Sequence, residues 1–162
     1  MDKSPFERVN KMQIIEYDPR YRQYFIDFNT EWIIEYFGFL EDEDIETFEK
    51  IDEELENGAM IYFAVENDAP LAACMTKPME NGTWEICKLG SNKNKPHKGC
   101  GSAVFNAAVQ WAIDKGAKRL FIVTNKKLKT AIHIYEKYGF KQIKIDDYKY
   151  ERGDIAFERI IE

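Results

Sequence analysis

The residues with the clearest chemical meaning form a turn between a strand-like segment and a helix-like segment. This glycine turn, residues 98–102, reads Lys-Gly-Cys-Gly-Ser, and a helical pattern begins near Gly101. The first turn of a helix leaves about four backbone N–H groups without internal partners, and the aligned peptide dipoles add about half a positive charge. Glycines remove the side chains that would hold a phosphate away, and Lys98 adds a full charge. The turn therefore predicts an anion site that suits a diphosphate.

Other interpretations of the glycine turn follow from the same residues. A short glycine turn before a helix also occurs for structural reasons alone. The kinase-type phosphate loop needs GxxxxGK followed by Ser or Thr, and the spacing here does not supply it. Cys100 offers a third chemistry, because a thiol at a helix N-terminus has a lowered pKa and can act as a nucleophile. No GxCxG elbow surrounds it.

Length and composition indicate one domain. The chain has 162 residues, of which 44% are hydrophobic, enough for one substantial core. No stretch approaches the roughly 20 apolar residues of a membrane helix, and residues 1–11 lack the apolar core of a signal peptide. We expect a cytoplasmic protein with a flexible N-terminal arm, residues 1–11, and a single domain, residues 12–162.

Charge and cysteine usage exclude several function classes. The net charge of -6 argues against nonspecific binding to nucleic acid or to a membrane, since both need a cationic surface. Cys74, Cys87 and Cys100 form no CxxC pair, so we expect neither a disulfide framework nor a metal site. Between Glu35 and Asn57, eleven acids accompany one base. Such a segment is usually a solvated face, but beside a substrate groove it would favour cationic substrates.

Hydrophobic periodicity predicts strands and helices in the order β, two helices, three strands, then βαβ-type alternation. Asn81-Gly82 is a strong hairpin signal, because both residues tolerate positive φ. The expected strands are residues 12–17, 60–65, 71–76, 83–89, 119–124, 139–145 and 154–161, and the expected helices are residues 21–36, 44–56 (capped by Asp44), 101–115 and 129–138.

Two segments resemble signatures of the GNAT superfamily of N-acetyltransferases, and the resemblance covers nearly the whole chain. Residues 84–89 and then 98–104 look like the family's (Q/R)xxGxG/A acetyl-CoA motif, although Pro96 stands where the family has Gln or Arg. Residues 124–125 and then 131–140 are similar to its A(x)3Y(x)3GF signature. The resemblance implies an α/β (α+β) acyl-CoA N-acyltransferase fold, with helices on both faces of a mixed, mostly antiparallel sheet of six or seven strands.

The same resemblance implies an activity and a set of site residues. Acetyl-CoA would serve as co-substrate, without a metal, and its acetyl group would pass directly to an amine in a ternary complex. Glu85 would take the amine's proton, directly or through water, and Tyr135 would protonate the leaving thiolate. The residues expected to bind the coenzyme are Leu89, Ser91, Lys98, Gly99, Cys100, Gly101, Ser102 and Asn125. The acceptor would be a small-molecule or peptide amine, cationic if the acidic segment flanks its groove, and a homodimer is compatible with the sequence.

Each assignment has a structural alternative. Glu85 can be an ordinary solvent-facing strand residue, and Tyr135 can be a core aromatic flanked by Ile132 and Tyr138 at helical spacing. Two other functions also remain open. A non-catalytic CoA-binding module is compatible with Pro96 and would release no thiol, and a cysteine-dependent hydrolase would use Cys100 with His97 or His133.

Overall fold

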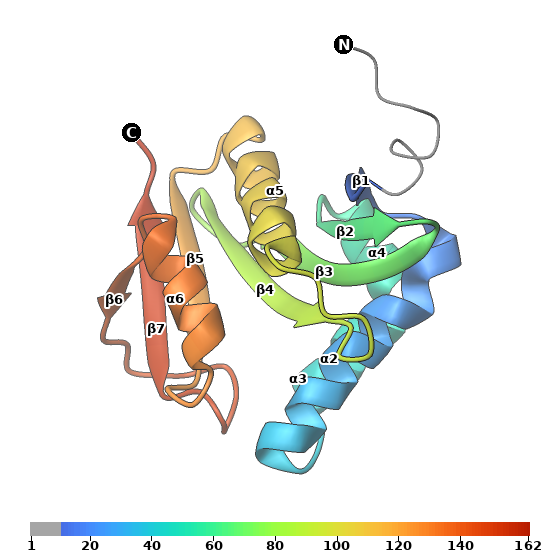
Figure 1. The fold of residues 1–162 in the computed structure, drawn as a ribbon. Coiled ribbons are helices and arrows are strands. Elements are labelled where there is room, and N and C mark those ends of the chain that lie inside the picture. The colour runs from blue at the N-terminus through green and yellow to red at the C-terminus, as the bar shows by residue number, and fades with distance from the viewer. Residues whose placement is uncertain (1–10) are drawn as a thin grey trace.

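The computed structural model describes residues 11–162, so all of the predicted arm except Lys11 lies outside the described residues (Figure 1). The elements follow the predicted order: β1 (Gln13–Glu16), η1 (Pro19–Tyr21), α2 (Arg22–Phe37), α3 (Asp42–Glu49), α4 (Ile51–Glu56), β2 (Met60–Glu66), β3 (Ala69–Pro78), β4 (Thr83–Ser91), α5 (Cys100–Asp114), β5 (Arg119–Thr124), α6 (Lys129–Lys137), β6 (Lys141–Ile143) and β7 (Ile155–Ile160). In this described part, no helix has both the length and the apolar character needed to cross a membrane.

The strands form one sheet in the order β1-β2-β3-β4-β5-β7-β6. Neighbouring strands are antiparallel except β4 and β5, which run parallel. A parallel pair needs a crossover connection, and α5 supplies it. The expected mixed, mostly antiparallel sheet is therefore confirmed, with seven strands in the described residues.

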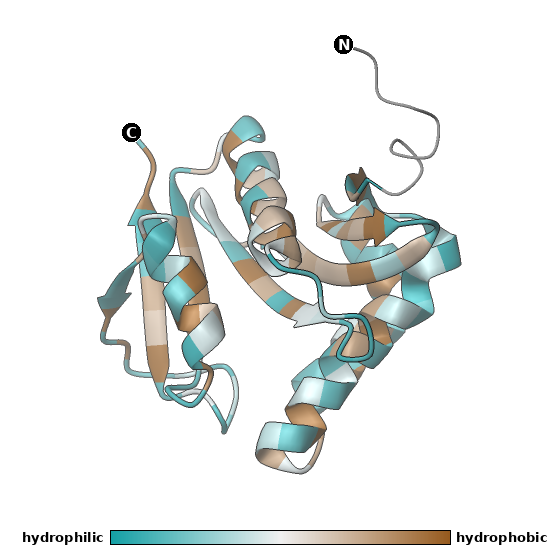
Figure 2. Cartoon of the chain, in the orientation of Figure 1, coloured by the Kyte–Doolittle hydropathy of each residue, from teal (hydrophilic) through white to brown (hydrophobic). Residues whose placement is uncertain are grey.

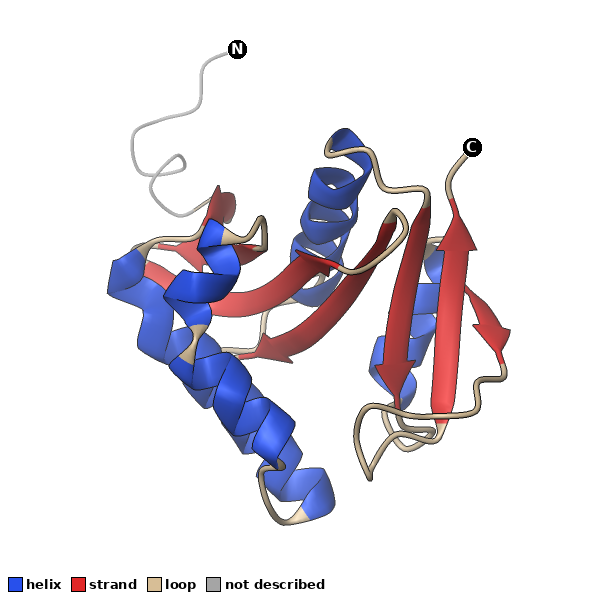
Figure 3. Ribbon diagram, turned by 180° about the vertical axis from the view of Figure 1, so that it is seen from behind, coloured by secondary structure: helices blue, strands red, loops and turns tan. Residues whose placement is uncertain are grey.

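Helices cover both faces of the sheet: α5 and α6 lie on one face, and α2, α3 and α4 on the other (Figures 1 and 3). Side chains alternate between the two faces along a strand. On β3, Ala72 and Cys74 join the core under α5, whereas Ala73 and Met75 join the core under α2. Figure 2 shows that α6 also carries both hydrophobic and hydrophilic residues. The result is a sheet with a hydrophobic core on each side.

The parallel pair β4 and β5 separates after a short contact. Residues 83–85 pair with residues 119–121, and β4 then diverges from β5 (Figure 3). The cause is a bulge in β4: the register against β3 shifts beyond Cys87, and Lys88 has a φ of 52°. A bulge bends the strand that carries it. The second half of β4 thus has an edge that is not paired with β5.

The acidic segment differs from the prediction of one helix over residues 44–56. It forms two helices, α3 and α4, that meet at Lys50, whose φ of -110° and ψ of 26° are not helical. The N-cap is Glu41 rather than Asp44, and the Asp44 carboxylate accepts a hydrogen bond from the Glu41 N–H at 2.9 Å. This capping box is an N-terminal signal that lies three residues earlier than predicted. Asp44 itself is fully buried, so its carboxylate lies in the interior.

Candidate active site

A cavity of about 1010 Å³ lies at the separation of β4 and β5. One end of this central cavity is lined by the glycine turn, and its middle by residues 86–91 of β4 and residues 122–125 of β5. The opposite end is lined by Trp32 and Tyr36 of α2 and by Tyr150 and Arg152 of the loop between β6 and β7. The bulge therefore creates a passage that extends from the start of α5 to the loop over the far end of β4.

The glycine turn presents main-chain donors to the cavity. Gly99, at φ 84°, is the N-cap of α5. Within residues 11–162, the amides of Lys98, Gly99 and Ser102 donate to no protein oxygen, while the Gly101 amide adjoins the Cys100 sulfur. The Cys100 amide donates to the carbonyl of His97 at 3.3 Å. Lys98 belongs to the turn itself, and three further lysines line the cavity: Lys93, whose ammonium pairs with Glu35 of α2, Lys127, which lies over the ring of Phe37, and Lys129.

This end of the cavity has the features of an anion site. Unpartnered N–H groups at a helix start point at a ligand, and the helix dipole favours negative charge there. A Cβ added to Gly99 would meet no atom within 4 Å, so the space beside the turn is open. The turn thus fits the diphosphate predicted from the sequence.

Cys100 has the environment of a structural cysteine. The residue is 5% exposed, and its thiol lies 3.9 Å from the carbonyl oxygen of Leu71. Burial raises the pKa of the thiol, although nearby backbone N–H groups partly oppose the shift. The ring of His97 contacts Glu66 at 3.1 Å. A nucleophile needs a lowered thiol pKa, so this geometry disfavours the cysteine-dependent hydrolase.

Tyr135 is both a core aromatic and a cavity residue. Its ring packs against Phe105 and Phe157, with centroid distances of 5.2 and 5.8 Å. Its hydroxyl has the side chain of Thr124 as a hydrogen-bond partner, and the residue lines the cavity. Burial raises the pKa of Tyr135 well above its ordinary value, so the hydroxyl keeps its proton at neutral pH. The structural and the catalytic interpretations of Tyr135 are therefore compatible.

Glu85 is buried rather than solvent-facing, with 2% exposure. It immediately precedes the cavity-lining part of β4, and its carboxylate accepts a hydrogen bond from Lys149 Nζ at 2.9 Å. Burial by itself would lower the pKa of Lys149, but the charge and hydrogen bond of Glu85, together with the nearby Cys87 and Tyr150, outweigh burial and raise it. The structure thus places the predicted proton acceptor against an ammonium group of the β6–β7 loop.

The other predicted coenzyme residues lie in the cavity wall. Leu89 and Ser91 follow the bulge, on the part of β4 that is not paired with β5. The Asn125 amide group donates to the carbonyl of Arg152 at 2.7 Å, and its oxygen accepts from the Lys127 N–H at 2.8 Å. The side chain of Asn125 is therefore engaged within the protein, and its contact with pantetheine stays a prediction.

Sequence analysis missed a charge cluster at the far end of the cavity, formed by Asp44, Lys88, Tyr150 and Arg152. Arg152 donates to both oxygens of Asp44 at 2.6 and 2.7 Å. Lys88 donates to Asp44 and, at 3.0 Å, to the Tyr150 hydroxyl. Burial by itself would raise the pKa of Asp44, but the Arg152 hydrogen bonds and the Lys88 charge hold it at about 2.

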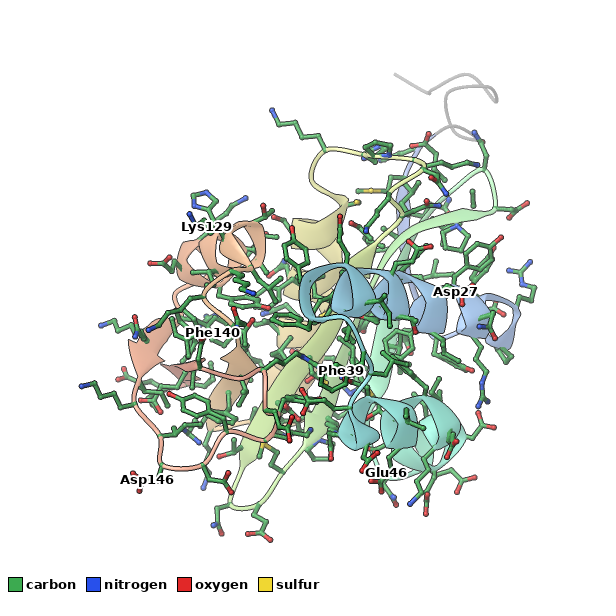
Figure 4. The ribbon with its side chains drawn as sticks, turned by 90° about the horizontal axis from the view of Figure 1, so that it is seen from below. Asp27, Phe39, Glu46, Lys129, Phe140 and Asp146 are labelled. Carbon is green, nitrogen blue, oxygen red and sulfur yellow. The ribbon has the colours of Figure 1, made fainter. Side chains whose placement is uncertain are left out.

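The charge cluster fastens the β6–β7 loop to α3 across the bulge of β4, where Lys88 lies. Figure 4 shows this end of the molecule from below, with Glu46 marking α3 and Asp146 marking the loop. The Arg152 guanidinium also stacks on Tyr150 and Trp32, at 4.2 and 5.5 Å from the ring centroids. The only sequence signal for this end was the acidic segment, because the residues that pair with Asp44 are 44 and 108 positions away.

Comparisons with known proteins agree with this architecture. The model of the acetyltransferase (GNAT) family matches residues 21–140. The uncharacterized N-acetyltransferase YobR of Bacillus subtilis (strain 168) is 26% identical over 91 residues, which are 56% of this chain and 37% of YobR. The matched part thus spans little more than a third of that relative's length.

Two solved structures share the fold. The GNAT-family acetyltransferase of Staphylococcus aureus Mu50 superposes with a TM-score of 0.82 and 18% identity, covering 94% of this chain and 100% of that one. The putative acetyltransferase yncA of Salmonella typhimurium, solved with its cofactor acetyl-CoA, gives a TM-score of 0.76 and 11% identity, covering 94% and 95%. The family model matches most of the chain, and the sheet topology, the separation of β4 and β5 and the glycine turn agree with it. The chain belongs to the GNAT family of acetyltransferases.

Proposed function

We propose that the protein transfers the acetyl group of acetyl-CoA to an amine within a ternary complex. The observation that carries this proposal is the central cavity, which joins main-chain donors at the start of α5, without oxygen partners in residues 11–162, to Tyr135. A thioester on a long flexible arm needs both an anchor for its phosphates and a channel to the reacting atoms. The separation of β4 and β5 offers the channel, and the glycine turn offers the anchor.

The coenzyme would lie along the cavity from the turn to the middle of the sheet. Its diphosphate would accept hydrogen bonds from the amides of Lys98, Gly99, Gly101 and Ser102, with the Lys98 side chain beside it. The pantetheine arm would follow Leu89, Ser91 and Asn125, which line the passage. A preformed channel of this kind aligns the thioester carbonyl before the amine arrives, which removes much of the entropic cost of the reaction.

The chemistry requires three proton transfers: two from the amine nitrogen and one to the leaving thiolate. An alkylamine with a pKa of about 10.4 is mostly protonated at neutral pH, so Glu85 takes its proton, directly or through water. The nitrogen lone pair then attacks the thioester carbonyl carbon, and the carbon–sulfur bond breaks. The departing thiolate takes the proton of Tyr135, which burial keeps protonated until that moment. The acylated nitrogen gives up its second proton, which restores the Tyr135 hydroxyl through water, and Glu85 releases the first proton to solvent, so the products are an N-acetylated amine and CoA.

The replacement of Tyr135 by Phe tests this mechanism. We expect Tyr135→Phe to lower kcat by about 10- to 1000-fold, because acid catalysis contributes in this range, while acetyl-CoA still binds. Tyr138→Phe is the matched control, since Tyr138, the residue that caps the end of α6, also packs against Phe105, with a ring-centroid distance of 5.7 Å. Release of CoA thiol with a panel of amines gives the rates. An unchanged rate in Tyr135→Phe would remove this residue from the mechanism, and binding of acetyl-CoA without thiol release from any amine would indicate a non-catalytic module.

A further inference from the structure

The ammonium of Lys149 lies in a site built from three other residues. Its Nζ is 2.9 Å from the Glu85 carboxylate and 3.0 Å from the Glu43 carboxylate. The ring centroid of Tyr150 is 5.5 Å from the same nitrogen, close enough for a cation–π interaction. We call Glu43, Glu85 and Tyr150 the ammonium site. It recognises a primary ammonium by charge, by hydrogen bonds and by an aromatic face.

The ammonium site adjoins the central cavity. Glu85 and Cys87 are two residues apart on β4 and point to the same face of the sheet, and Cys87 lines the cavity. Tyr150 belongs to both, because it lines the cavity and stacks beside Lys149. A group held at Glu85 thus lies next to the passage that leads to Tyr135.

Lys149 does not make the main contact that holds the β6–β7 loop in place. The loop is already held by Arg152, which is 9% exposed at its side chain and makes two hydrogen bonds to Asp44. The Lys149 side chain is 25% exposed, whereas that of Glu85 is 3% exposed. A partly exposed lysine on a four-carbon stem can rotate into solvent while the charge cluster stays intact. The buried Glu85 carboxylate would then need another cation, because an unpaired buried charge is costly.

We propose that Lys149 occupies the place of the acceptor's amino group, and that the acceptor is a primary ammonium on an unbranched alkyl chain, such as a lysine side chain or a diamine. This inference rests on the proposed function, in which Glu85 accepts the proton of the attacking amine. Lys149 is then a specificity-determining residue: only an acceptor that reproduces its ammonium and its stem displaces it from Glu43 and Glu85.

The replacement of Lys149 tests this inference by removing the internal competitor. In Lys149→Ala, the KM for Nα-acetyl-lysine amide should fall by about tenfold or more with kcat little changed, because an internal competitor lowers the apparent affinity in proportion to the fraction of sites that it leaves free. Lys149→Gln should also lower this KM. Because it keeps a hydrogen-bond donor near Glu85, it replaces the alanine variant in the test if that variant folds poorly. Lys144→Ala, an exposed position of the same loop, is the control and should keep the parent KM.

A second measurement does not depend on catalysis. Without acetyl-CoA, n-butylammonium should raise the unfolding temperature of Lys149→Ala more than that of the parent, and n-butanol should not. Adding Glu43→Gln to Lys149→Ala should reduce this response, since one of the two carboxylates is lost. An unchanged or increased KM in both Lys149 variants, or equal stabilisation by butanol and butylammonium, would overturn the inference. Stabilisation by butylammonium without thiol release from any amine would support the ammonium site and refute only the proposed transfer.

Discussion

The two ends of the central cavity are built from different kinds of group. The glycine-turn end presents main-chain N–H groups from one continuous segment, residues 98–102. The far end is held by side chains from α3, β4 and the β6–β7 loop, which meet at Asp44. Within residues 11–162, the amides of Lys98, Gly99 and Ser102 at the first end lack protein oxygens as partners, whereas at the second end the charges are paired with one another. The glycine-turn end is therefore suited to binding an anion, and the far end to stabilising the fold.

This difference has an energetic consequence. Unpartnered donors at a helix start contribute little to folding and become useful when a ligand arrives. A buried carboxylate with two cationic partners contributes mainly to the folded state, because removal of one partner leaves uncompensated buried charge. Substitutions at the glycine turn should therefore affect mainly coenzyme binding, and substitutions in the charge cluster should affect mainly stability.

The largest expected effect is that of Asp44→Asn on stability. This change keeps the shape of the side chain but leaves Lys88 without a carboxylate and Arg152 with only that of Glu41, so the free energy of unfolding should fall by about 3–5 kcal/mol. Urea denaturation measures the change. Asp42→Asn, at an exposed position of the same helix, should alter stability by no more than about 0.5 kcal/mol. Similar effects of the two changes would contradict a stabilising role of the charge cluster.

Acid should remove part of the same stabilisation. The pKa of Asp44 is about 2 in the folded state against an ordinary 3.8, so the unfolded chain binds the proton first as the pH falls. The contribution is complete above about pH 5 and is lost between about pH 4 and pH 2, and it amounts to roughly 2 kcal/mol. The difference in unfolding free energy between the parent and Asp44→Asn should therefore shrink by this amount between pH 5 and pH 2. A constant difference would show that Asp44 does not titrate in this way.

The smallest effect on stability is expected at the glycine turn, where the effect on binding should be distinctive. Gly99 and Gly116 flank α5 with φ values of 84° and 94°, and an added Cβ would meet no atom within 4 Å at either. Alanine at either position should cost about 1–2 kcal/mol of unfolding free energy, because L residues are strained there. Only Gly99→Ala should also weaken acetyl-CoA binding, which calorimetric titration would detect. Equal affinities of the two variants would place the diphosphate elsewhere.

Local patterns were sufficient for most of the fold. The strand over residues 119–124 was predicted with the bounds it has in β5, and the remaining elements were found within a few residues. Turn chemistry explains part of this success: Asn81 and Gly82 have φ values of 57° and 74°, as a hairpin turn requires. The break at Lys50 was missed, because acidic residues continue through it without a Gly or Pro to mark the end of α3.

The amino-acid sequence by itself determined the order of the elements and the glycine turn at the start of α5, because both depend on backbone preferences and on spacing within one segment. Only the tertiary structure decided that Asp44 is buried between Lys88 and Arg152, and that Lys149 occupies the site at Glu85. Those contacts join residues 44, 108 and 64 positions apart, and the strength of an ion pair depends on burial and distance, which a linear pattern does not contain.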